Sequence, residues 1–129
     1  MNDEILERIS EILISRAGSV FAFFADHRES EGIFDVSFYS DKEMDEYEMR
    51  LIEAEVEKIL GGATEINNLK ECDCMFIGEI LAGAQIIHCS NEKEKNRFLA
   101  SVAHDAEIVR IKREIMLSRI RESGVAYEH

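Results

Sequence analysis

Proline and tryptophan are missing from this 129-residue chain, and basic residues, cysteines and long apolar runs are few. With no proline and no low-complexity stretch, nothing marks a domain boundary, so we expect a single domain over residues 1–129. No apolar run approaches the roughly 18 residues of a membrane-spanning helix. The start, MNDEILERIS, also lacks the basic-then-apolar pattern of a signal peptide. These absences predict a cytoplasmic, globular protein that does not enter a membrane.

Basic residues are scarce relative to acids. Lysine and arginine total 15 against 27 aspartates and glutamates, which gives a net charge of −12. Nucleic-acid phosphates are bound by clustered lysine and arginine, so we expect no direct binding of nucleic acid. The acidity suits a basic protein partner, and it equally suits an acidic domain whose charge only maintains solubility.

The three cysteines, Cys72, Cys74 and Cys89, are an odd and small set. A disulfide framework is not expected from such a count. A zinc site needs four ligands, usually from two closely spaced pairs. His88 beside Cys89 would bring the number of candidate ligands to four, but the sequence gives no further support for a site. We expect reduced thiols on or near the core.

Hydrophobic periodicity predicts eight elements in the order α-β-β-α-β-α-β-α. The expected helices cover residues 3–16, 41–60, 72–85 and 90–122, and the expected strands cover 19–25, 33–40, 63–69 and 86–89. Asp41 is the predicted cap of the second helix, and Gly18 the stop of the first. This order predicts an α+β domain in which a small mixed sheet has helices packed mainly on one side.

The stretch FFADHRESEGIFDVSF, residues 23–38, places a polar turn between two strand-like runs. Alternation in the second run puts Asp35 and Ser37 on one face of the strand. Two acids at such positions, with a third on a neighbouring strand, can hold divalent metal and so stabilise the leaving pyrophosphate of a nucleotide. Here the second position is the neutral Ser37, and Glu65 in ATEINNL is the candidate third acid.

A phosphate-binding turn after the first strand usually carries Gly-Ser, whose small size and donors admit a triphosphate. This chain has Phe24 and Ala25 there, and Phe24 is bulky. Asp35 and Glu65 therefore remain candidates for a remnant metal site, and the sequence assigns no catalytic residue. The alternative for Asp35 is an acid near a sheet edge, paired with Arg28, His27 or water.

These motifs resemble the minimal nucleotidyltransferase (MNT) family, which belongs to the DNA polymerase beta-like superfamily. The segment 23–38 lies where the family has its Asp-x-Asp motif, and TEINNL is similar to the third-strand motif, with Glu65 and Asn68 in place of aspartates. EILAGAQIIHCSNEKEKNRF, residues 79–98, is the most family-like stretch. The resemblance covers nearly the whole chain, and implies a nucleotidyltransferase fold with a long C-terminal helix.

The resemblance also implies roles for single residues. The first metal-binding acid of the family corresponds to Asp35 and the third to Glu65, while the second corresponds to Ser37. The Gly-Ser pair corresponds to Phe24 and Ala25, and the remaining degenerate position is that of the turn arginine, near Arg28. We expect no cofactor, and Mg²⁺ with ATP only if the chain is an active enzyme.

Three functions are compatible with these residues. The resemblance favours a catalytically inactive antitoxin that binds and neutralises a HEPN-type RNase toxin. The first alternative is an active nucleotidyltransferase that transfers AMP to the partner toxin, using Asp35 and Glu65, with Asp26 or Asp41 as a further ligand. The second alternative is a structural protein that self-associates through its final helix.

The final helix carries two apolar rows, which form a stripe too wide for one small sheet to cover. The residues expected to face a second chain are drawn from Ile108, Ile111, Ile115, Met116 and Ile120. The alternative is a long helix that wraps over its own domain. A homo-oligomer through this helix is therefore one of the expected assemblies.

Overall fold

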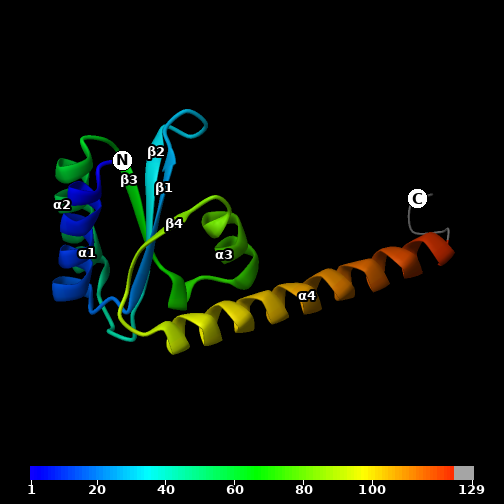
Figure 1. The fold of residues 1–129 in the computed structure, drawn as a ribbon. Helices are drawn as coiled ribbons and strands as arrows, with labels where there is room; N and C mark the ends of the chain where they lie inside the picture. The colour runs from blue at the N-terminus through cyan, green and yellow to red at the C-terminus, as the bar shows by residue number, and fades with distance from the viewer. Residues whose placement is uncertain (124–129) are drawn as a thin grey trace.

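The computed structural model describes residues 1–123 and places a four-stranded sheet between two layers of helices (Figure 1). Residues 124–129, which belong to the predicted domain, lie outside the described part. The elements are α1 (Asp3–Ala17), β1 (Phe21–His27), β2 (Ile33–Tyr39), α2 (Glu46–Leu60), β3 (Thr64–Asn68), the short 3-10 helix η1 (Leu69–Glu71), α3 (Cys74–Leu81), β4 (Gln85–Cys89) and α4 (Glu92–Ser123). This order confirms the predicted α+β class.

The sheet is mixed, as predicted, with strand order β3-β2-β1-β4. β1 pairs with β2 and with β4 in the antiparallel direction, while β2 and β3 run parallel. The register aligns Asp35 with Ala25 on one side and with Glu65 on the other. Because paired residues point to the same face of a sheet, these three side chains share a face.

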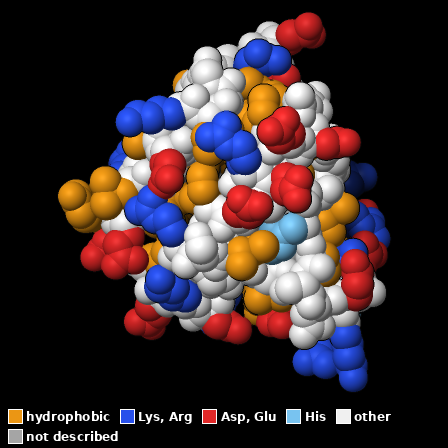
Figure 2. All heavy atoms as spheres, turned by 60° about the vertical axis from the view of Figure 1, so that its left-hand side comes forward, with side chains coloured by type: hydrophobic (Ala, Val, Ile, Leu, Met, Phe, Trp, Pro, Cys, Tyr) orange, Lys and Arg blue, Asp and Glu red, His pale blue; other side chains and the backbone are white. Residues whose placement is uncertain are grey.

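One face of the sheet packs against α1 and α2 (Figure 1). Its core is built from buried apolar side chains on both helices and on the alternate strand positions, among them Leu13, Phe24, Val36 and Ile52. On the outside of this layer acidic and basic side chains are interspersed with apolar ones (Figure 2), and Arg16 of α1 pairs with Glu55 of α2.

The other face of the sheet is also covered, which corrects the expectation of helices mainly on one side. Phe21, Leu69, Ile77 and Ile80 form a second buried cluster, against which Phe98 at the start of α4 packs. The physical reason is that β1 is apolar on both faces, so its second face also needs a helical layer. The sheet therefore lies between two layers, with α3 and the first turns of α4 on the second side.

The second helix begins later than predicted. Asp45, not Asp41, is its cap, and its Oδ1 accepts a hydrogen bond from the Glu48 N–H at 2.8 Å. The segment before α2 is hydrogen-bonded to other elements and does not join the helix. Ser40 Oγ donates to the Ala17 carbonyl at 2.6 Å, and Lys70 Nζ donates to Asp41 Oδ1 at 2.6 Å. Gly18 ends α1 as predicted, in the left-handed conformation with φ 65°.

The last helix, α4, is a single helix of 32 residues that leaves the body after its first turns (Figure 1). Its N-terminus is closed by Asn91, whose Oδ1 accepts from the Glu94 N–H at 3.0 Å. No residue of α4 is buried. Among the described residues, no helix is both long and apolar enough to cross a membrane.

Candidate functional site

The fold brings the two predicted carboxylates together. Asp35 on β2 and Glu65 on β3 are register partners across parallel strands, and both border a cavity of about 240 Å³ between the sheet and α3. Two further acids, Glu31 in the turn and Glu79 on α3, border the same cavity. The complete lining is His27, Glu31, Asp35, Glu65, Asn67, Phe76, Glu79 and Ile80.

Asp35 is the most enclosed of these acids, with 8% of its surface exposed. Its Oδ2 lies 3.3 Å from His27 Nε2, so the predicted pairing with histidine is the one that forms. Burial raises the pKa of the Asp35 carboxyl; His27 opposes this shift, and the charges of Glu65 and Glu31 add to it. The carboxylate therefore lies in an acidic surrounding that its single histidine partner does not neutralise.

Ser37, the position of the missing acid, is buried on the same strand face, with 1% of its surface exposed. Its register partner on β3 is Asn67. Among the described residues, neither Ser37 Oγ nor Asn67 Nδ2 has a hydrogen-bond partner. An unpaired buried polar group costs about 1–3 kcal/mol. The strip from Asp35 and Glu65 to Ser37 and Asn67 is thus a polar seam that the fold retains at a cost in stability.

Phe24 and Ala25 do not form a turn, because β1 continues through both of them to His27. The Phe24 ring lies in the core with α1 and α2, stacked on Phe34 at 5.8 Å, and thus on the face opposite Asp35. The backbone of Phe24 is in register with Val36 on one side and Gln85 on the other. Backbone donors used in a sheet cannot cradle a phosphate, so the obstruction comes from strand pairing rather than from the bulk of the ring.

Arg28 is held away from the carboxylates. Its guanidinium pairs with Asp26 at 2.7 Å and lies 4.5 Å from the centre of the Phe34 ring. This hydrogen bond lowers the pKa of Asp26 to about 2. Asp41, the other proposed extra ligand, pairs with Lys70. Neither Asp26 nor Asp41 borders the cavity of Asp35 and Glu65.

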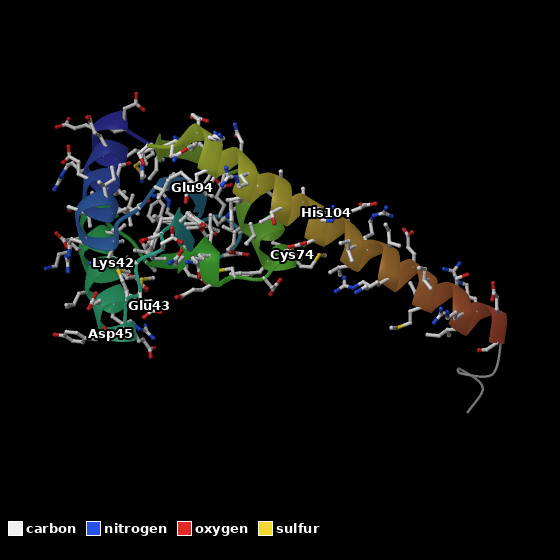
Figure 3. The ribbon with its side chains drawn as sticks, turned by 90° about the horizontal axis from the view of Figure 1, so that it is seen from below. Lys42, Glu43, Asp45, Cys74, Glu94 and His104 are labelled. Carbon is white, nitrogen blue, oxygen red and sulfur yellow. The ribbon has the colours of Figure 1, made fainter. Side chains whose placement is uncertain are left out.

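The remaining histidines and cysteines form no site around this cavity. His88 Nε2 lies 2.7 Å from Ser19 Oγ, and burial lowers the pKa of this histidine. His104 is exposed on α4, beyond the body (Figure 3). Cys72, Cys74 and Cys89 are all free, as expected. Across residues 1–123, no group of three or more His, Cys, Asp and Glu side chains is arranged to hold a metal ion.

Three participants were missed by the sequence interpretation: Glu31, Asn67 and Glu79. The alternation of β3 contained a signal for Asn67, because it stands two residues after Glu65 and so shares its face. Glu31 and Glu79 reach the cavity from a turn and from α3. Their position depends on how those segments pack on the sheet, which periodicity does not report.

The sequence matches no protein-family model and no curated protein. Solved structures do match. A chain in the structure of a tri-AMPylated Shewanella oneidensis HEPN toxin in complex with MNT antitoxin aligns with a TM-score of 0.75 at 8% identity, covering 94% of this chain and 99% of that chain. A chain in the crystal structure of the toxin–antitoxin MntA–HepT aligns with a TM-score of 0.75 at 7% identity, covering 93% and 99%. A toxin–antitoxin structure with AMP-PNP gives a TM-score of 0.73 at 6% identity, covering 94% and 99%.

At such low identities, these matches show the fold. The chain has the nucleotidyltransferase-like fold of the MNT type over nearly its whole length. This confirms the fold class that the resemblance implied, including the small mixed sheet and the long C-terminal helix.

Asp35→Asn is expected to stabilise the folded chain at neutral pH. Because the folded state raises the pKa of Asp35 above its ordinary value of 3.8, the stability of the wild type falls as pH rises from that value through the raised pKa. Asparagine removes this charge, so its advantage should be present at pH 7 and vanish well below 3.8. Urea unfolding followed by circular dichroism at several pH values measures the difference.

Asp26→Asn is the matched control, with the opposite sign. Its pKa is lowered to about 2, so its contribution to stability is present above 3.8 and is lost as pH falls through 2. This variant should be slightly less stable than the wild type at pH 7. A destabilised Asp35→Asn at pH 7 would contradict the description of the site.

Proposed function

We propose that this chain is an antitoxin of the MNT type, which binds and neutralises a HEPN-type toxin by docking and without nucleotide transfer. The observation that carries the proposal is the combination of a complete MNT-type fold with a polar seam that has serine at the position of the second acid. The structures matched are complexes of toxin and antitoxin by their own descriptions.

The chemistry of the polar seam supports the proposed absence of nucleotide transfer. A magnesium–triphosphate site needs carboxylates that are free to coordinate the metal and backbone donors that are free to bind the phosphates. Here Asp35 is paired with His27, and Phe24 is held in the sheet. The cavity is bordered by four acids, so it repels a polyphosphate unless metal ions neutralise them first. The residues present do not fit a site for Mg²⁺ and ATP.

Electrostatics supports a protein partner with a basic surface. The net charge of −12 lies on the body, because residues 1–103 contain 22 of the 27 acids and 10 of the 15 bases. An RNase toxin binds phosphate backbones through clustered basic residues. An acidic antitoxin would be steered to such a surface and would cover it, which neutralises the toxin by occlusion.

We expect the chain to bind the product of a neighbouring gene that encodes a helical toxin. In a pull-down with the full chain as bait, the complex should form without added nucleotide or Mg²⁺ and should weaken as salt is raised, because screening reduces the attraction of charged surfaces. An unrelated acidic domain of similar size is the control for non-specific capture. No helical partner in the pull-down, and no protection of cells from its toxicity, would remove the proposal.

An active nucleotidyltransferase is the second candidate. It is favoured by the adjacency of Asp35 and Glu65 at one cavity, and by the AMPylated toxin in the description of one matched structure. On this alternative, Asp35 and Glu65 would be the ligands of Mg²⁺.

Isothermal titration with Mg²⁺ and ATP separates the two candidates. The docking proposal predicts no saturable heat with the wild type, because Asp35 is paired with His27 and the backbone of Phe24 is paired in the sheet. Asp35→Ala is the informative variant. Asp26→Ala is the control, because Asp26 lies on β1 with its side chain on the opposite face of the sheet. Saturable binding by the wild type that disappears in Asp35→Ala and persists in Asp26→Ala would favour the enzyme.

A further inference from the structure

Towards its C-terminus, α4 extends away from the body (Figures 1 and 3), and several of its apolar side chains are exposed. Ile108, Ile111 and Ile115 are 37%, 43% and 48% exposed. Met116 and Leu117 are exposed as well. The prediction that α4 carries more apolar surface than its own domain covers is therefore confirmed, and the question is what covers each row.

The two apolar rows of α4 lie on different sides of the helix. At 100° per residue, the row that packs on the body through Phe98 and Val102 is separated from the row of Ile108, Ile111 and Ile115 by about 125° on average. The second row, here called the isoleucine seam, thus faces away from the body.

The isoleucine seam has the spacing of a coiled-coil core. Ile108 and Ile115 take the a positions of two heptads and Ile111 takes the d position between them. Isoleucine at a with leucine at d favours two strands, whereas isoleucine at both positions favours three or four; here Ile111 occupies d, so the flanking charges, not the core residues, specify the pairing. The neighbouring d positions are His104 and Ser118, so the apolar core is short.

The charges that flank the seam select its partner. The g positions on one flank are Glu107 and Glu114, and the e positions on the other flank are Lys112 and Arg119. In a parallel pair each g residue lies beside the e residue five positions later on the other helix. That relation joins Glu107 to Lys112 and Glu114 to Arg119, twice each by symmetry. An antiparallel pair would instead place Lys112 near its own copy, and Glu114 near its own copy.

We propose that α4 pairs in parallel with α4 of a second copy of this chain along the isoleucine seam. The two bodies then lie at the same end and on the outer sides of the pair, because each packs on the far side of its own helix. This proposal is independent of the proposed antitoxin function, and leaves the Met116 side of α4 for other contacts.

One set of contacts within the helix has to rearrange or be shared. Arg110 donates to Glu107 and to Glu114 at 2.5 Å in the second case. All three side chains are more than half exposed, and such surface pairs contribute about 0–1 kcal/mol. Within residues 1–123 no ion pair engages Lys112 or Arg119. Exchange of one carboxylate partner for another is therefore a small cost beside burial of six isoleucines.

Sedimentation analysis of the full chain tests the pairing. Because the core spans only two heptads, the expected dimer is weak, and its fraction should rise with protein concentration. Ile115→Asp should weaken dimerisation by about tenfold or more, since a carboxylate in the seam is desolvated. Leu117→Asp is the matched control, because Leu117 is also 48% exposed but lies off the seam. Circular dichroism verifies that each variant keeps its helix content.

Substitutions that reverse the flanking charges test whether the two α4 helices run parallel. Lys112→Glu with Arg119→Glu should abolish the dimer, and adding Glu107→Lys with Glu114→Lys in the same chain should restore it. Ser118→Cys should give a disulfide between copies at residue 118, located by peptide mapping, because a parallel pair places this d position opposite itself.

Three results would overturn the proposal. The first is a wild type that stays monomeric up to its limit of solubility. The second is equal loss, or equal retention, of the dimer in Ile115→Asp and Leu117→Asp. The third is a monomeric wild type whose binding to a helical toxin is lost in Ile115→Asp, which would assign the seam to that partner while leaving the antitoxin function supported.

Discussion

The parallel register of β2 on β3 is the constraint on which the rest of this structure depends. It sets Asp35 beside Glu65 and Ser37 beside Asn67, and so gathers every polar side chain of the two strands' shared face into one seam. The alternate positions, such as Val36, are then free to form the core with α1 and α2. A slip of β3 by one residue would turn Glu65 and Asn67 to the face of α1 and α2 and would separate Glu65 from Asp35.

The consequences of this register are chemical as well as structural. The seam has the layout of a site for metal and nucleotide, with serine where a second acid would stand. Asp35 is partnered by His27 and has a raised pKa, and the unpaired Ser37 and Asn67 lie further along the seam. A fold that keeps such a polar seam without a full ligand set gains nothing in stability from it. Docking of a basic partner is a use of this scaffold that needs no ligand set.

Much of this fold could be predicted from the sequence, because its elements are short, strongly periodic and bounded by glycines. The face shared by Asp35 and Ser37 followed from period two alone. The start of α2 was wrong because Ser40 and Asp41 bond to α1 and η1 instead of continuing the helix. Helices on both faces were missed because Phe21 contributes to a second core, which a count of elements does not reveal. Glu79 reaches the cavity only through the packing of α3, and pattern gives no information on such packing.

The central claim is that this chain neutralises its partner by contact and not by the carboxylates of the seam. The most direct measurement is growth of cells that express the partner toxin together with the double variant Asp35→Ala, Glu65→Ala. Unfolding curves should verify that the variant is folded, and the wild type serves as the reference. The account predicts protection equal to that of the wild type. Loss of protection by a folded double variant, together with loss of AMP transfer to the toxin, would contradict it.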